Sequence, residues 1–165
     1  LMIAPYVSWQ FTPGHSVGIA PIITYQRCSA DGLQAFDTPF LSTSPGNVTN
    51  RGTDDSWGVG VRVGYMGQIN KYLSVGIAYA SKVDMDEFGR YKGLFAESGD
   101  FDIPSSLVAG FAVTPDDRWT LALIGRNITD EIYATLGTDK SGGSGEVMAV
   151  AAEPRAVVLQ LETRF

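Results

Sequence analysis

Hydrophobic and polar residues alternate along seven stretches of the chain. These stretches, which we predict to be β-strands, are residues 2–11, 16–27, 56–67, 72–82, 105–114, 118–127 and 155–165. Successive side chains of a strand point to opposite faces of a sheet, so a period of two residues indicates a strand with one apolar face. In the third stretch, Trp57, Val59 and Val61 share one face, while Gly58 and Gly60 lie on the other. The pattern predicts an all-β fold.

The connections between these strands alternate between short and long. Residues 12–15, 70–72 and 114–117 are short and rich in Pro, Gly, Asn and Asp, which suit tight turns. The long connections span 28–55, 83–104 and 128–154. We therefore predict an antiparallel up-and-down meander with turns at one end and long loops at the other, which is typical of outer-membrane β-barrels.

The second face of the predicted strands distinguishes a membrane barrel from a soluble sheet. In a soluble protein this face would meet water and carry Lys, Glu, Thr and Arg. Here it is mostly Gly, Ala and Ser, as expected where strands curve around an interior. Aromatic residues fall near the strand ends and resemble two interfacial girdles: Trp9, Phe11, Tyr65, Tyr72, Trp119 and Phe165 by the turns, and Tyr25, Trp57 and Tyr79 by the loops. The sequence thus predicts a transmembrane β-barrel in contact with bacterial outer-membrane lipid.

An odd number of strands leaves this barrel incomplete. Bacterial single-chain barrels have even strand numbers, because an open edge in hydrocarbon leaves unpaired backbone N–H and C=O groups. Three explanations follow: the chain is part of a larger barrel, it assembles with strands from other chains, or one strand escapes detection. For the third, the connection 128–154 is the expected position, around GEVMAVAA.

Composition limits the chemistry that the chain can carry out. A net charge of -6 argues against nucleic acid as a partner, and the single cysteine, Cys28, excludes an intrachain disulfide. The only histidine, His15, lies in a predicted turn without a patterned nucleophile. The acidic run Asp84, Asp86 and Glu87 lacks EF-hand spacing and is interpreted as a hydrated loop rather than a Ca²⁺ site. We expect no catalytic residue, no metal and no cofactor.

Two groups of residues are candidates for ligand binding. By strand parity Arg62, Lys82 and Arg126 are expected to point into the barrel, where each charge needs an acidic partner, water or an anionic ligand. Both pairing with luminal acids and contact with a fatty-acid carboxylate remain open. The loop residues Phe36, Phe40, Leu94 and Phe95 either bind an apolar ligand or pack the loops onto the rim.

Most of the chain resembles one family of outer-membrane transporters. GLQAFD, NVTNRGTDDSWGVGVRVGYMGQI and YKGLFAESGDFDIPSSL occur in an order and spacing similar to the FadL-type family, over roughly residues 1–117. These transporters carry long-chain fatty acids and related hydrophobic compounds. The resemblance implies a barrel of about 14 strands, an N-terminal hatch and lateral passage of the ligand through the wall. The chain lacks the hatch and about half of the strands, so a complete transport path is not expected from it alone.

The last part of the chain resembles a different family. RWTLALIGRNITDEIY and AEPRAVVLQLETRF look like the last two strands of a TonB-dependent receptor. The similarity rests on Asn127, Ile128, Thr129, Asp130 and Tyr133, and on the final "EPR" strand that closes on Phe. No plug domain or TonB box is visible. The prediction is a single barrel domain, 1–165, whose residues 118–165 are receptor-like.

These observations support one principal hypothesis. The chain is predicted to serve passive uptake of hydrophobic compounds such as long-chain fatty acids, without a chemical step. The alternatives are the C-terminal part of a TonB-dependent siderophore or nutrient receptor and a chimeric or structural barrel without native transport. In the families that the chain resembles, the barrel-assembly machinery reads the terminal strand, so Leu159, Leu161 and Phe165 are expected to form the insertion signal.

Overall fold

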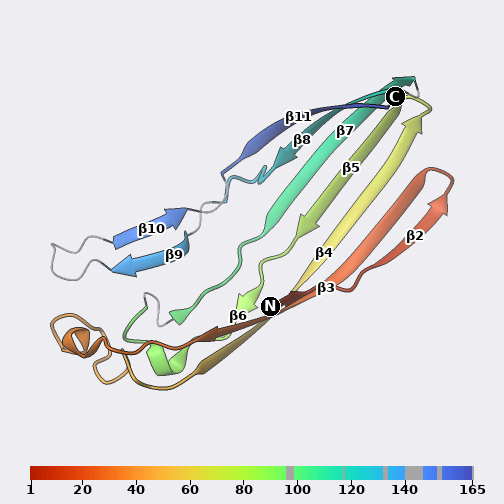
Figure 1. The fold of residues 1–165 in the computed structure, drawn as a ribbon. Coiled ribbons are helices and arrows are strands. Elements are labelled where there is room, and N and C mark those ends of the chain that lie inside the picture. Colours follow the sequence, from red (N-terminus) through yellow and green to blue (C-terminus); the bar gives the residue numbers. More distant parts are fainter. Residues whose placement is uncertain (96–98, 117, 132–133, 140–146, 152–153, 165) are drawn as a thin grey trace.

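Strands dominate the computed structural model, which describes residues 1–95, 99–116, 118–131, 134–139, 147–151 and 154–164 (Figure 1). The strands are β1 (Met2–Ile3), β2 (Val7–Thr12), β3 (His15–Cys28), β4 (Asp54–Asn70), β5 (Leu73–Ala80), β6 (Asp84–Met85), β7 (Ser106–Asp116), β8 (Trp119–Arg126), β9 (Ala134–Asp139), β10 (Val147–Ala151) and β11 (Ala156–Thr163). Two single 3₁₀ turns, η1 (Gln34–Phe36) and η2 (Gly89–Tyr91), lie in the long loops. In the described residues no helix is long and apolar enough to cross a membrane.

The principal sheet is an antiparallel meander. Its order is β1-β3-β4-β5-β7-β8-β11, with β2 also pairing with β3 and β6 with β4. The sheet curves but does not close, and all three short turns lie at the end near the C-terminus (Figure 1). The predicted all-β meander is confirmed. The connection 128–154 does contain a strand at GEVMAVAA, namely β10. In the described residues, β10 pairs with β9 alone, so the two form a hairpin outside the principal sheet.

The first predicted strand is divided by a proline. Met2 pairs with Thr24, and Val7 pairs with Ile19, so β1 and β2 keep one register along β3. Leu1 and Tyr25 exchange both backbone hydrogen bonds, each 2.8 Å long. Hydrogen-bonded pairs recur every second residue, and the register therefore places Pro5 opposite Pro21 at such a position. Neither proline has an N–H, and the ladder is interrupted there.

A second irregularity separates β5 from β6. Arg62 of β4 pairs with Ala80, whereas Val59 pairs with Asp84, so the segment 81–83 contains one residue more than the strand opposite. Ser81 covers this β-bulge: its N–H donates to the carbonyl of Val61 (2.8 Å), and its Oγ accepts from the N–H of Val61 (3.0 Å). A bulge of this kind reverses the side-chain parity beyond it.

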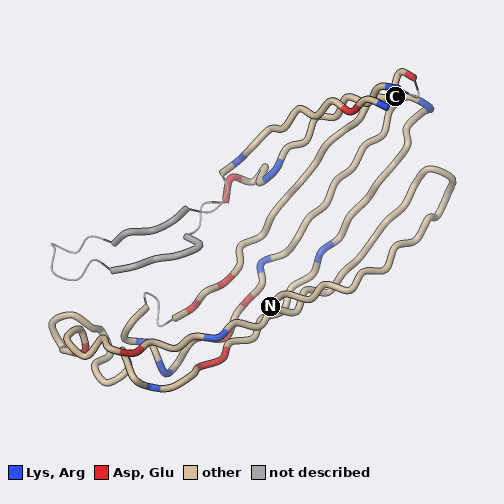
Figure 2. The backbone as a smooth tube through the Cα atoms, in the orientation of Figure 1, with Lys and Arg blue, Asp and Glu red and all other residues tan. Residues whose placement is uncertain are grey.

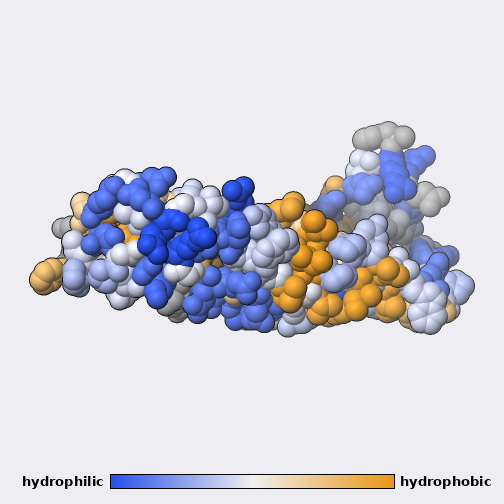
Figure 3. Space-filling model, turned by 90° about the horizontal axis from the view of Figure 1, so that it is seen from below, coloured by the Kyte–Doolittle hydropathy of each residue, from blue (hydrophilic) through white to orange (hydrophobic). Residues whose placement is uncertain are grey.

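Large apolar side chains cover one face of the sheet, here called the outer face. Val7, Val59, Val157, Leu159 and Leu161 are each more than 60% exposed. Figure 3 shows a hydrophobic band over the strands, bordered by the hydrophilic loop end. Exposed apolar surface on this scale is unfavourable in water but fits contact with lipid. Trp9, Tyr25, Trp57, Tyr72, Tyr79 and Trp119 lie at the two margins of this face, and Trp57 packs against Tyr25 with tilted rings whose centroids are 4.7 Å apart.

The loop end contains most of the buried side chains. Val48, Phe88 and Tyr91 are almost fully buried where the loop after β3 meets the segment between β6 and β7. The Tyr91 hydroxyl donates to the carbonyl of Gly52, and the Arg90 backbone N–H donates to Asp54 (2.8 Å). The two long loops therefore pack as one cap instead of extending separately into solvent. Charged residues gather at this end and at the turns, whereas long stretches of strand between them carry none (Figure 2).

Candidate luminal site

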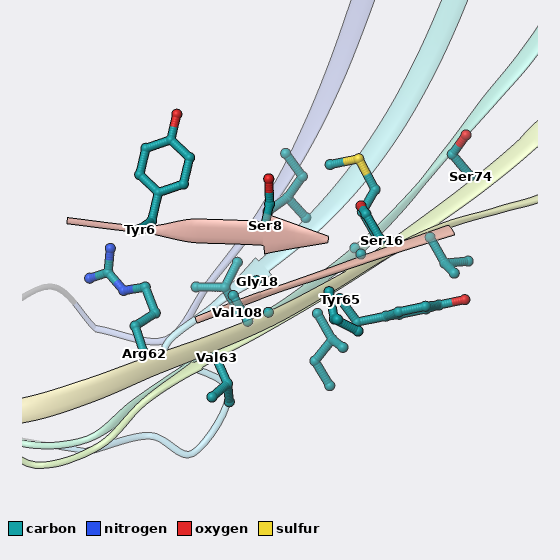
Figure 4. A pocket seen from close by; sticks show the side chains of 18 of the residues that line it. Tyr6, Ser8, Ser16, Gly18, Arg62, Val63, Tyr65, Ser74 and Val108 are labelled. Carbon is teal, nitrogen blue, oxygen red and sulfur yellow. The ribbon is translucent and has the colours of Figure 1, made fainter. Parts of the chain in front are cut away.

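The inner face, opposite the apolar one, is lined by small side chains. The register aligns Ser16, Met66, Gly76 and Gly110 in one row across the strands, and Gly18, Gly64 and Ala78 in the next. These residues line a groove of about 570 Å³ that crosses from β2 to β8. Figure 4 shows Tyr6, Ser8 and Ser16 on this side of the sheet and Val63 on the opposite side. Apart from Tyr6, Arg62 and Met66, the side chains on this face are small or aliphatic, so the groove is broad and mostly apolar.

Among the described residues that line this groove, Arg62 is the one with a positive charge. It pairs with Ala20 on β3 and Ala80 on β5, two small residues that leave its side chain room to extend. The guanidinium points to the same side as Tyr6, as Figure 4 shows. Among the described residues no carboxylate lies within ion-pair distance of it, although Arg27, Arg90 and Arg155 each have an acidic partner. A charge without an acidic partner at membrane depth is a candidate functional group.

Arg126 reaches a second cavity, which it shares with Arg62. This cavity has a volume of about 240 Å³ and lies between the loop ends of β3, β5, β7 and β8. Ile22 and Val83, each 2% exposed, form its apolar wall. Ser81, Ser105, Ser106 and Asn127 also line the cavity and offer hydrogen-bonding groups. The structure thus brings together two of the three cations that strand parity selected.

Lys82 lies elsewhere. Its ammonium contacts Asp84 at 3.0 Å and also contacts Asp102. Asp84 pairs with Val59, whose side chain lies on the outer face, so the bulge turns this ion cluster away from the two cavities. The difference from the expected luminal orientation arises because simple alternation does not account for an inserted residue. Hydrogen bonding to Lys82 holds the pKa of Asp102 below its usual value, and the Met85 N–H also donates to this carboxylate (2.7 Å).

The four loop candidates have different environments. Phe95 packs with Phe101 at a centroid distance of 4.8 Å and with Phe88 at 6.3 Å, so it belongs to the cap. Phe40 is 97% exposed at a turn closed by the backbone bond from Leu41 to Thr38. Phe36 and Leu94 are half-buried. Packing accounts for Phe95, whereas Phe40 presents a free apolar side chain to the exterior.

The terminal strand presents the expected pattern on its outer face. Leu159 and Leu161 are 68% and 61% exposed and pair with Leu123 and Leu121 of β8. Phe165 lies outside the described residues. His15 lies at the start of β3, and its Nδ1 is 2.7 Å from the Tyr65 hydroxyl on the outer face, within the aromatic group near the turns. This environment agrees with a structural position for His15.

Sequence reasoning missed Tyr6 and the serine-rich lining of the smaller cavity. Tyr6 lies between β1 and β2. Because the strand is interrupted at Pro5, the alternating pattern did not indicate that Tyr6 belongs to the inner face. Ser105 and Ser106 were expected at the start of an ordinary strand. Only the approach of four strand ends in space shows that they border the same cavity as Arg62.

The curved sheet, with an apolar outer face and a small-residue inner face, has the fold of part of a FadL-type outer-membrane β-barrel. No family model matches the chain, and no curated protein matches it significantly. The structure is similar to the toluene transporter TbuX of Ralstonia pickettii (TM-score 0.50, 15% identity), covering 97% of this chain and 50% of that one. A second similar structure is the monoaromatic hydrocarbon channel CymD (TM-score 0.43, 19% identity, 76% of this chain and 43% of that one).

The similarity confirms the FadL-type resemblance at the level of the fold. The chain spans about half the length of the toluene transporter, in agreement with a sheet that does not close. Because 97% of the chain is covered, the similarity extends into the segment that resembled a TonB-dependent receptor. Neither solved structure is such a receptor, and nothing in the comparisons supports that part of the prediction.

Proposed function

We propose that this chain forms part of the wall of an outer-membrane channel for the passive uptake of hydrophobic compounds. The observation that carries the proposal is the small-residue groove of about 570 Å³ on the inner face of a sheet whose outer face is apolar. A water-filled porin lumen is polar, whereas this groove is lined mainly by Gly, Ala, Val and Ile. The similarity of the fold to that of a toluene transporter supports the same class of cargo.

The proposed mechanism consists of binding and diffusion. Apolar surface of a ligand leaves water when it enters the groove, and this burial is favourable without any directional bond. Glycine and alanine side chains project little, so a ligand can slide between neighbouring rows without a steric barrier. The mechanism needs no catalytic residue and no cofactor. Long-chain fatty acids are one candidate cargo, and exposed Phe40 is a candidate first contact at the cap.

The proposal is tested by uptake into liposomes that contain the assembled barrel. Labelled toluene and a labelled long-chain fatty acid are the probes, and a polar sugar of similar mass is the control solute. We expect saturable uptake of at least one hydrophobic probe, faster than in protein-free liposomes, and no uptake of the sugar. Equal rates with and without the folded barrel would refute the proposal.

A variant of the groove links the uptake to this surface. Gly76→Leu places a large side chain in the centre of the groove, where the closest neighbour of an added Cβ is the carbonyl of Tyr65 at 3.9 Å. The added side chain should therefore be accommodated without disturbing the sheet while it fills the path. We expect slower uptake of hydrophobic probes by this variant. Ile77→Leu on the outer face is the matched control and should transport normally.

A further inference from the structure

We propose that residues 99–103, here called the strap, fasten the cap to the wall while Asp100 and Asp102 share one proton, and that loss of this proton releases the cap. The inference goes beyond the proposed function, because it concerns a conformational change at the loop end. Its consequence for uptake rests on the proposed function.

The strap is held to the segment that follows β5 at both of its ends. Ile103 and Val83 exchange two backbone hydrogen bonds, 2.8 and 3.0 Å long. At the other end, the carbonyl of Gly99 accepts from the N–H of Phe88 at 3.1 Å. Between them Phe101 packs edge-on against Phe88, with ring centroids 5.9 Å apart. Separation of the strap would therefore uncover the aromatic interior of the cap.

Asp102 joins the middle of the strap to the same segment through its charge. Its carboxylate accepts from the Met85 N–H at 2.7 Å and contacts the ammonium of Lys82. Lys82 has a second carboxylate partner, Asp84, at 3.0 Å. Hydrogen bonding to Lys82 lowers the pKa of Asp102. Asp102 therefore stays ionised over the pH range in which an exposed Asp titrates.

Asp100 supplies the proton of this cluster. Its carboxyl group and that of Asp102 hydrogen-bond to each other. Two ionised carboxylates have acceptors only, so this bond needs a proton, which Asp100 carries because Asp102 is ionised. Oδ1 of Asp100 is enclosed and has no hydrogen-bond partner in the described part of the chain. Burial, followed by the hydrogen bond with Asp102, raises the pKa of Asp100.

Loss of the proton reverses the balance of charge at the strap. Three carboxylates, those of Asp84, Asp100 and Asp102, then share the single ammonium of Lys82. Among the described residues no second cation lies within ion-pair distance of these carboxylates. Like charges in contact disfavour the ionised form, and separation of the groups removes this cost. Ionisation of Asp100 therefore favours movement of the strap away from Lys82.

The two shifted carboxyl groups act in different pH ranges. The raised pKa of Asp100 stabilises the closed strap fully below the ordinary Asp value of about 3.9, and this contribution is lost as pH rises through the raised value. Between these two values the equilibrium constant for opening should rise about tenfold per pH unit. The lowered pKa of Asp102 has the opposite effect, but only below the ordinary Asp range, so it does not cancel the effect of Asp100.

Opening of the strap should also change the inner face. Val83 and Ile103 lie on opposite sides of the contact that the strap makes, and both line the cavity of about 240 Å³ at the loop ends of the strands. Their separation would widen this cavity toward the exterior. We therefore expect access to the groove from the loop end to increase as Asp100 loses its proton.

Hydrogen exchange on the assembled barrel in detergent tests the strap directly. The amides to follow are those of Val83, Met85 and Ile103, whose hydrogen bonds all join the strap to the facing segment. Protection factors between about pH 4 and about pH 8 are compared, so that the pH dependence of chemical exchange is removed. We expect protection of the wild type to fall as pH rises.

Two variants separate the titration from the rest of the contact. In Asp100→Asn the side-chain amide can donate to Asp102 at every pH, so protection of the strap should no longer depend on pH. Asp86→Asn is the matched control, because Asp86 is exposed on the segment that faces the strap and its substitution removes the same charge. This control should keep the pH dependence of the wild type.

The outcomes decide the inference separately from the proposed function. Constant protection of the wild type across the pH series would overturn the inference, and so would an unchanged pH dependence in Asp100→Asn. Toluene uptake into liposomes should be faster at about pH 8 than at about pH 4 in the wild type and equal in Asp100→Asn. Strap release without uptake of any hydrophobic probe would refute the proposed function alone. Uptake that ignores strap release would reject its effect on access.

Discussion

At the scale of single residues, Gly58 of β4 allows another segment to approach the sheet. A Cβ at Gly58 would meet the carbonyl of Asp84 at 2.8 Å and Val83 at 2.9 Å. At Gly64, on the same strand and face, the nearest atom is a backbone oxygen at 3.6 Å. Alternation predicted small residues on this face, but not that β6 folds against one of them. Glycine is therefore required at position 58, where β6 lies against the sheet, and not at position 64.

This difference predicts unequal effects of the same substitution. Gly58→Ala should lower the free energy of unfolding by about 1–3 kcal/mol, because backbone and buried side chains must move to admit the methyl group. Gly64→Ala, the matched control, should change stability much less, since its contact is of ordinary van der Waals length. Urea unfolding of the barrel in lipid vesicles measures both. Equal effects would show that β6 does not pack against Gly58.

The ion cluster of Lys82 and Asp102 predicts a pH dependence at the loop end. The pKa of Asp102 is lowered in the folded state, first through its hydrogen bond with Lys82. A lowered carboxyl pKa stabilises the fold above the ordinary Asp range near 3.9 and loses this effect as pH falls through the lowered value. Asp102→Asn should therefore be less stable than the wild type by a constant amount between about pH 5 and 8. The difference should shrink below about pH 4, and unfolding curves at several pH values measure it.

At the scale of elements, proline divides the edge of the sheet. Pro5 faces Pro21 at a position where two backbone bonds would otherwise form, because β1 and β2 share one register on β3. The seven predicted strands were recovered because alternation reports directly on the two faces of a sheet. The interruption and the bulge at residues 81–83 were not predicted, since both depend on which residue lies opposite.

A backbone N–H donor at position 5 should stabilise the edge of the sheet where β1 and β2 pair with β3. Pro5→Val supplies an N–H that can bond the carbonyl of Pro21, and we expect about 0.5–1.5 kcal/mol of added stability. Hydrogen exchange of the β3 amides beside the interruption, at Ile19 and Ile23, should slow. Pro13→Val in the turn between β2 and β3 is the control, because no ladder position is gained there. Unchanged exchange in Pro5→Val would show that the strands do not approach at this point.

At the scale of the whole molecule, the two edges of the sheet run in the same direction. Seven successive strand positions from β1 to β11 are joined antiparallel, so the first and the last are parallel to each other. An antiparallel barrel then requires an odd number of further strands that begin in the opposite direction. A second copy in the same orientation would make two parallel seams. Closure as an antiparallel barrel would therefore need strands other than those of a second copy.

A polypeptide of residues 1–165 expressed alone should consequently fail to form a closed barrel. We expect no heat-modifiable monomer after refolding into detergent, and rapid hydrogen exchange at β2 and β11. Backbone groups at an open edge in hydrocarbon are unpaired, which opposes insertion of the isolated sheet. A compact, heat-modifiable monomer of one such chain would contradict the edge geometry.

The terminal strand carries a prediction about assembly. Deletion of Phe165 should reduce the amount of folded barrel in the outer membrane, because the barrel-assembly machinery is expected to read the end of this strand. Leu159 and Leu161 occupy its outer face as that role requires. Semi-quantitative blotting of outer-membrane fractions measures the effect, and Gln160→Asn on the other face is the control. Normal insertion of the deletion variant would argue against an insertion signal here.

The sequence by itself determined the strands, their faces and the solvent of each face. These properties are local: period two sets the faces, turn residues set the reversals, and the Gly/Ala/Ser composition of one face indicates that the bulky apolar face opposite it meets lipid. The tertiary structure alone decided which charges meet. It joined Arg62 and Arg126 in one cavity through contacts across four strands and turned Lys82 away by one inserted residue. Strand register and β-bulges depend on pairing between residues distant in the sequence. Hydrophobic periodicity along the chain therefore cannot predict them.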